Sequence, residues 1–115
     1  MEALESLDVW KKACQLSVSV YGLVDKCSNP GFKDQVTRSA LSIPSNIAEG
    51  YERDYRPEMV RFCRIAKGSA GELRTQLYIG IKAGFIKAED AGVCIEASLE
   101  ISRMLQGLIK HYQSA

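Results

Sequence analysis

The stretch RSALSIPSNIAEG, Arg38 to Gly50, has the spacing of a helix but contains residues that helices seldom accept. Its apolar side chains recur at intervals of three or four, which is the period of one helix face. Pro44 lies in the middle, although proline lacks an amide hydrogen and its ring clashes with the carbonyl group four residues earlier, at Ala40. The stretch therefore decides whether the chain forms one long helix here or two short ones.

The apolar pattern continues on both sides of the proline. It predicts a helix over about residues 33–53, and its inward positions step by four, three, four and four along Val36, Ala40, Ile43, Ile47 and Tyr51. Because the pattern is unbroken across Pro44, it favours one kinked helix. The alternative is a new helix that starts near Ser42, where the serine hydroxyl could cap the first turn.

Three further segments have helical periodicity, over about residues 7–26, 57–83 and 88–111. The sequence SNPG at residues 28–31 and the glycine at Gly84 separate these segments, and Pro57 suits a first helical turn. No segment shows the two-residue alternation of a convincing strand. Four helices with short connections favour an antiparallel up-down-up-down bundle. The sequence therefore predicts an all-α fold with a single four-helix-bundle domain over residues 1–115.

The composition is that of one globular domain. The 115 residues are 46% hydrophobic and 25% charged, which argues against disorder, and the net charge of +1 points to no class of partner. The opening MEALESLDVWKK lacks the pattern of a signal peptide. No apolar run approaches the roughly 18–20 residues of a membrane span. We therefore expect a cytoplasmic protein with reduced thiols and no membrane contact.

Few residues suggest catalysis. The four cysteines have no CxxC spacing: Cys14, Cys27, Cys63 and Cys94. Nothing in the spacing pairs one of them with His111, the single histidine, so neither a zinc site nor a Cys–His nucleophile is indicated. Glu49 and Glu72 lack the ExxH motif of a di-iron bundle, and KGSAGEL at residues 67–73 lacks the spacing of a phosphate loop. The sequence predicts no enzyme, no metal and no cofactor.

The polar side of the helix around Pro44 is unusual because its residues are small. At about 100° per residue, a set that we call the polar face falls on one side of the helix: Arg38, Ser42, Ser45, Asn46, Glu49 and Arg53. Serine and asparagine are poor helix formers, so a face that only met solvent would gain from Lys, Glu and Gln. The small polar groups suit a close hydrogen-bonded contact, and the alternative is a solvated face.

The next helix carries a row of cations. Five cations and one tyrosine, which we call the basic stripe, share an arc of about 80° without a carboxylate: Arg56, Arg64, Lys67, Arg74, Tyr78 and Lys82. Cations beside an aromatic ring are typical of phosphate contact and base stacking. The alternative is a solvated face that happens to be basic. The same helix contains Gly68 and Gly71, which either let a neighbouring helix approach closely or lie neutrally at the surface.

Several motifs resemble one family. The pattern RSAxSIPSNIAEGxxR at residues 38–53 resembles the signature of the four-helix-bundle family of 23S rRNA intervening-sequence proteins. IAKGSAGELxTQL at residues 65–77 is similar to its second signature, and LDVWKKA at 7–13 and MLQGLIK at 104–110 also fit. The resemblance covers nearly the whole chain. The turn SNPGFKDQ at residues 28–35 departs from the short acidic run that is more common in the family, which concerns that loop and not the fold.

The resemblance implies a four-helix bundle that forms ring-shaped homo-oligomers, with the pentamer as the expected form. One branch, the accessory variability proteins of diversity-generating retroelements, is similar in fold and binds nucleic acid and a reverse transcriptase, whereas no activity is established for most members. We therefore expect a non-enzymatic homo-oligomer that binds RNA or DNA, with a protein partner as a further option. The alternative is a structural or protein-interaction ring that binds no nucleic acid.

Ring formation would explain the polar face, because polar groups buried between subunits need hydrogen-bond partners. Glu72 and Gln76 lie one turn apart in the second signature and would offer such partners from a facing helix. These two residues and the polar face are therefore the predicted subunit interface or buried polar network.

Overall fold

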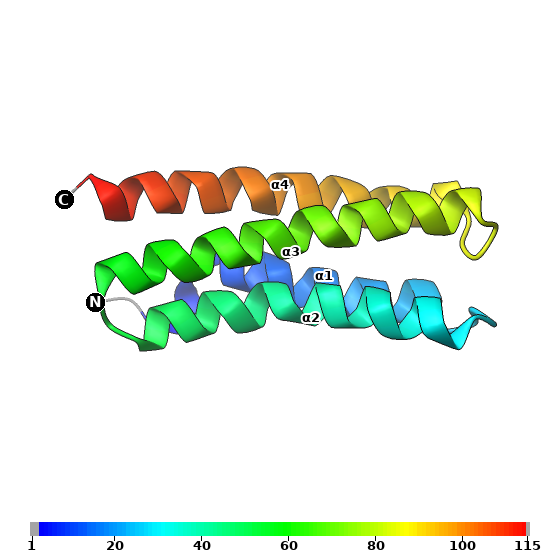
Figure 1. Ribbon diagram of the computed structural model, residues 1–115, viewed down its shortest axis with the longest axis horizontal. Helices are drawn as coiled ribbons and strands as arrows, with labels where there is room; N and C mark the ends of the chain where they lie inside the picture. Colours follow the sequence, from blue (N-terminus) through cyan, green and yellow to red (C-terminus); the bar gives the residue numbers. More distant parts are fainter. Residues whose placement is uncertain (1–2, 115) are drawn as a thin grey trace.

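The computed structural model describes residues 3–114, which form four α-helices in an elongated bundle of 46 × 20 × 18 Å (Figure 1). A short 3-10 helix, η1 (Leu4–Ser6), precedes α1 (Asp8–Val24), α2 (Pro30–Glu52), α3 (Arg56–Lys82) and α4 (Ala88–Gln113). The described residues contain no strand, so the predicted all-α four-helix fold is confirmed. Within the same residues, no helix has the length and hydropathy that a membrane span requires.

The start of α2 differs from the sequence prediction. The helix begins at Pro30 and not near residue 33, because the side chain of Asn29 accepts a hydrogen bond from the amide of Phe32 at 2.9 Å. Asn29 is thus an N-cap and Pro30 is the first helical residue, where a missing amide hydrogen costs nothing. The SNPG sequence therefore separates α1 from α2 and also forms the start of α2.

The helix α2 runs without interruption through Pro44, as the unbroken apolar pattern predicts. The proline leaves the carbonyl oxygen of Ala40 without its usual donor in the same helix. The hydroxyl of Ser17, from α1, lies 3.0 Å from this oxygen and 3.2 Å from the carbonyl oxygen of Ala13. Ser17 is 5% exposed and Ala40 is fully buried, so the serine supplies inside the core the hydrogen bond that proline cannot make.

The core contains one apolar face from each helix, and its largest fully buried side chains include Leu16, Ile43, Leu73 and Leu105. Two glycines bring elements close together. A Cβ atom added at Gly50 of α2 would lie 2.8 Å from the Cβ of Phe62 in α3, and one added at Gly80 would overlap the ring of Phe32.

The two glycines named from the sequence have a different environment. A Cβ added at Gly68 would meet nothing within 4 Å, and one added at Gly71 would meet only the Arg74 side chain at 3.9 Å. The idea that they admit a neighbouring helix within the bundle is therefore wrong.

We predict that Ser17→Ala lowers the free energy of unfolding by about 1–3 kcal/mol, because it leaves the buried Ala40 carbonyl oxygen without a donor. In a Pro44→Ala background the same change should cost less than about 1 kcal/mol, since residue 44 then provides an amide hydrogen. Urea unfolding of the two single variants and the double variant gives the coupling. Equal costs of Ser17→Ala in both backgrounds would contradict this role of the serine.

Candidate functional site

Most of the polar face is satisfied within its own helix. The hydroxyl of Ser42 donates to the carbonyl oxygen of Ser39 at 2.8 Å, and the amide of Asn46 donates to the carbonyl oxygen of Ser42 at 2.7 Å. Arg38 pairs with Asp34 one turn earlier at 3.0 Å, with both side chains exposed. Ser42 and Asn46 are half-buried, whereas Ser45 is exposed. The monomer therefore uses the small side chains to hydrogen-bond backbone carbonyls.

The end of the polar face joins α2 to α3. Arg53 donates to Glu49 at 3.1 Å and to Glu58 at 3.2 Å, and Glu58 also accepts from Arg61 at 2.8 Å. Both arginines lie over the ring of Phe62, with guanidinium carbons 5.1 Å and 4.5 Å from its centroid. The hydrogen bond from Arg61 and the nearby positive charges lower the pKa of Glu58. This cluster of charged side chains stabilises the turn between α2 and α3.

Glu72 and Gln76 differ in how they meet α2. The buried hydroxyl of Ser39 donates to Glu72 at 3.3 Å across the α2–α3 contact. Sequence reasoning did not include Ser39 among the site residues, although it belongs to the same run of small polar residues. The side-chain oxygen of Gln76 is buried and has no hydrogen-bond partner among the described residues. Within the predicted polar network, the described part of the chain therefore leaves the hydrogen bonding of Gln76 incomplete.

The basic stripe divides into two groups, and the first group faces α4. Arg56 donates to the backbone oxygens of His111 and Tyr112 at 2.9 and 3.1 Å and lies 5.0 Å from the centroid of the Tyr112 ring. Lys67 donates to Gln106 at 2.7 Å, and Arg74 donates to the buried hydroxyl of Ser98 at 3.3 Å. These three cations hold α3 against α4, and Arg56 satisfies carbonyl groups at the end of α4.

The second group is free to meet a ligand. Arg64, Tyr78 and Lys82 are exposed, and none of their side chains has a hydrogen bond or ion pair with another described residue. Arg64 lies in the run from Met59 to Gly71, which contains three cations and no carboxylate. Lys82 lies at the far end of α3, so the free cations are not contiguous along the stripe.

A second helix adds cations beside Arg64. The contacts of residue 56 with 112, 67 with 106 and 74 with 98 show that α3 and α4 are antiparallel. Residues 101–113 of α4 contain Arg103 and Lys110 but no carboxylate, and both side chains are exposed. They lie three residues before and four residues after Gln106, the residue that accepts from Lys67, and they point to the outward side of α4.

We call the resulting set the two-helix basic surface: Arg64, Lys67, Arg103 and Lys110. Sequence reasoning missed the two residues on α4 because it treated each helix separately. The signal that would have found them is the absence of carboxylates after Glu100.

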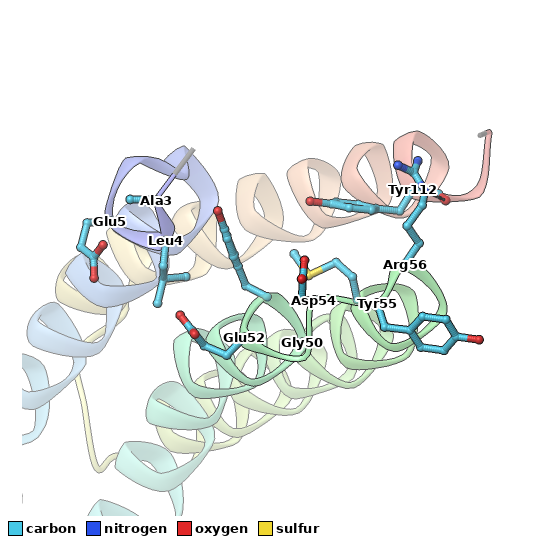
Figure 2. Close-up of a pocket in the computed structure, with 11 residues that line it drawn as sticks. Ala3, Leu4, Glu5, Gly50, Glu52, Asp54, Tyr55, Arg56 and Tyr112 are labelled. Carbon is cyan, nitrogen blue, oxygen red and sulfur yellow. Dashed lines mark hydrogen bonds between the residues drawn. The ribbon is translucent and has the colours of Figure 1, made fainter. Parts of the chain in front are cut away.

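A pocket of about 810 Å³ opens at the end of the bundle where η1, the α2–α3 turn and the end of α4 meet (Figure 2). Its wall carries three carboxylates, from Glu5, Glu52 and Asp54, against the single guanidinium of Arg56. That guanidinium already binds the carbonyl groups of α4. The pocket therefore disfavours an anionic ligand.

Three of the four cysteine thiols are not activated. Burial raises the pKa of Cys63 to about 11 and also raises the pKa values of Cys14 and Cys94. A raised pKa keeps the thiol protonated at neutral pH, which makes it a poor nucleophile. Nor do residues 3–114 bring three or more His, Cys, Asp or Glu side chains into a group that could hold a metal ion.

The division of the stripe predicts different stability effects for two arginines. Arg74→Ala should lower the free energy of unfolding by about 1 kcal/mol, because it removes the hydrogen bond to Ser98 between α3 and α4. Arg64→Ala is the matched control on the same helix and should change stability by less than about 0.5 kcal/mol. Urea unfolding measures both values, and equal costs would show that Arg74 has no special structural role.

Thiol labelling tests the environment of Cys63. With its pKa at about 11, about one Cys63 thiol in a thousand is ionised at pH 8, so alkylation of the folded protein should be slow. Cys14 and Cys27 are both partly exposed and should react before Cys63. Mass spectrometry of peptides from the iodoacetamide-treated protein gives the order in which the cysteines react. Unfolding in urea should remove the difference in reactivity between them. Early modification of Cys63 in the folded protein would contradict the described burial.

Comparisons with known proteins agree with this all-helical arrangement. A sequence model of the family described as 23S rRNA-intervening sequence protein matches residues 5–107. The fold is similar to the crystal structure of a protein of unknown function from the S23 ribosomal protein family of Bacteroides thetaiotaomicron, with a TM-score of 0.82 and 26% identity over 89% of this chain and 98% of that chain. No curated protein matches the sequence. The family match confirms the resemblance seen in the motifs, and the chain belongs to the family of 23S rRNA-intervening sequence proteins.

Proposed function

We propose that this protein is a non-enzymatic cytoplasmic protein that assembles with itself and binds RNA or DNA through the two-helix basic surface. The observation that carries the proposal is the pairing of two carboxylate-free runs, residues 59–71 of α3 and residues 101–113 of α4, along one end of the bundle. Five cations lie on these runs although the whole chain carries a net charge of only +1: Arg61, Arg64, Lys67, Arg103 and Lys110.

The positive charge is therefore concentrated, which is what phosphate contact requires. Arg64, Arg103 and Lys110 have no ion pair with another described residue, so binding a phosphate would break no internal salt bridge. Tyr78 is 52% exposed farther along α3 and would offer a ring for base stacking. A strand that followed α3 from Arg64 to Tyr78 would meet both kinds of contact.

Self-assembly is the second part of the proposal, and the family resemblance favours a pentameric ring. The half-buried polar side chains of Ser42 and Asn46 and the incomplete hydrogen bonding of Gln76 support an interface along the contact between α2 and α3. Exposed Ile65 and Ile79 on α3 would add apolar area to this interface. A ring would repeat the two-helix basic surface and strengthen the binding of one long strand.

We predict that single-stranded RNA binds the protein with an affinity that falls linearly in log salt concentration. Contact with all four cations of one chain would give a slope of about −3, since each phosphate contributes about −0.7 for a single strand. Arg64→Glu combined with Lys67→Glu should abolish retention of the RNA at about 100 mM salt. Fluorescence anisotropy across a salt series, on protein of known native mass, provides the measurement.

The matched control is Lys11→Glu combined with Lys26→Glu, two exposed cations of α1 and its end. Each pair of reversals changes the net charge by the same amount, from +1 to −3. Loss of binding in both variants would indicate a general charge effect and not a surface. Absence of binding by the intact oligomer at low salt would instead favour a structural or protein-interaction ring.

A further inference from the structure

The helix α4 carries a charge pattern that inverts when it is read from the other end. From its start, the helix presents Glu89, then Gly92 three residues later, then Glu96 four residues later. From its end, it presents Lys110, then Gly107 three residues earlier, then Arg103 four residues earlier. Each acid has a base at the mirrored position, and each glycine has a glycine.

These six positions lie on the outward side of α4. At about 100° per residue they fall within an arc of about 60°, opposite the buried residues Cys94, Ile101 and Leu105. The four charged side chains are exposed, and none has an ion pair or hydrogen bond with another described residue. Within the described residues, therefore, none of these four side chains contributes a contact between helices.

The glycines and the surface between them point to a close contact. Glycine is the weakest helix former after proline, yet a Cβ added at Gly92 or Gly107 would meet nothing within 4 Å. The single chain thus gives no packing reason for either glycine. Between them, Val93 is 70% exposed and borders a shallow groove of about 680 Å³ that Gly92, Glu96 and Arg103 also line.

We propose that α4 is the contact surface for a second copy of this chain, packed antiparallel about a two-fold axis. In that arrangement Glu89 faces Lys110 of the second copy, Glu96 faces its Arg103, and Gly92 faces its Gly107. The two-fold axis repeats every pair, so four ion pairs enclose two sites of close backbone approach. A parallel arrangement would place like charges opposite one another, so the charges select the antiparallel one.

Charge complementarity identifies the second copy as the occupant of this face. A purely basic peptide would match Glu89 and Glu96 but would meet Arg103 and Lys110 with like charge. A purely acidic ligand would have the opposite problem. The matching surface must carry two bases, then two acids, at the mirrored spacing, and α4 itself has this sequence.

This contact is separate from the proposed function but shares two residues with it. Arg103 and Lys110 also belong to the two-helix basic surface, so nucleic acid and the second copy would compete for them. Glu96 belongs to the self-contact alone. A variant at Glu96 therefore tests the contact while it keeps every cation proposed to bind phosphate.

The experiment measures native mass by sedimentation at low salt, over a concentration series, for Glu96→Arg and Arg103→Glu. Each variant places like charges opposite one another twice, so the dissociation constant should rise at least tenfold and the mass at a given concentration should halve. An equimolar mixture of the two variants should restore the wild-type mass, because the arginine introduced at position 96 of one variant then meets the glutamate introduced at position 103 of the other. The double variant Glu96→Arg/Arg103→Glu should also associate like the wild type.

A pair of steric variants provides the control. Gly92→Leu should weaken association, whereas Gly68→Leu, at an equally open glycine within α3, should not. The expected halving of the mass is the same whether the unit that associates through α4 is one chain or a ring. If a variant instead broke a ring at a different interface, the mass would fall by more than half. Glu96→Arg should still bind RNA, which separates a failure here from a failure of the proposed function.

Unchanged mass in both charge variants, or no recovery of the wild-type mass on mixing them, would overturn the proposal. A wild-type protein that does not associate further at any concentration would also overturn it.

Discussion

The carbonyl group of Ala40 imposes the constraint that fixes how the first two helices meet. Pro44 cannot donate to it, and its burial means that another helix must do so. Ser17 provides this donor at one position of α1. If α1 slid by one turn along α2, Ala13 or Tyr21 would replace the serine, and neither has a hydroxyl on its β-carbon. One polar contact thus sets the axial position of two apolar surfaces that would otherwise tolerate sliding.

The contact between α3 and α4 is fixed in the same way, by cations. Arg56, Lys67 and Arg74 bind groups of α4 at three heights along the bundle. Positive charge at the contact between α3 and α4 is therefore part of the fold, while Arg64 and the cations of α4 remain exposed. A surface that already needs cations for its structure gains affinity for phosphate with few further substitutions, which connects the architecture of this family member to the function proposed for it.

Periodicity predicted the four helices well because it reports burial, and burial determines most of this fold. It carried the helix across Pro44 correctly, but it could not supply Ser17 as the compensating donor, since that hydrogen bond joins residues 23 positions apart. The same limit applies to the candidate site. A helical wheel placed six residues in one basic stripe, whereas the position of α4 decides that three of them serve packing. Arg103 and Lys110 joined the site only when two helices were considered together.

The charges at the two ends of α4 also stabilise the single helix. Glu89 and Asp90 lie at its start and Lys110 and His111 at its end, which complements the partial charges that the aligned peptide dipoles place at the two ends. Any helix charged in this way is complementary to its own reversed copy. Selection for the stability of one chain would therefore create, as a by-product, a surface suited to pairing with an identical chain. Self-association could then evolve without a substitution that served it alone.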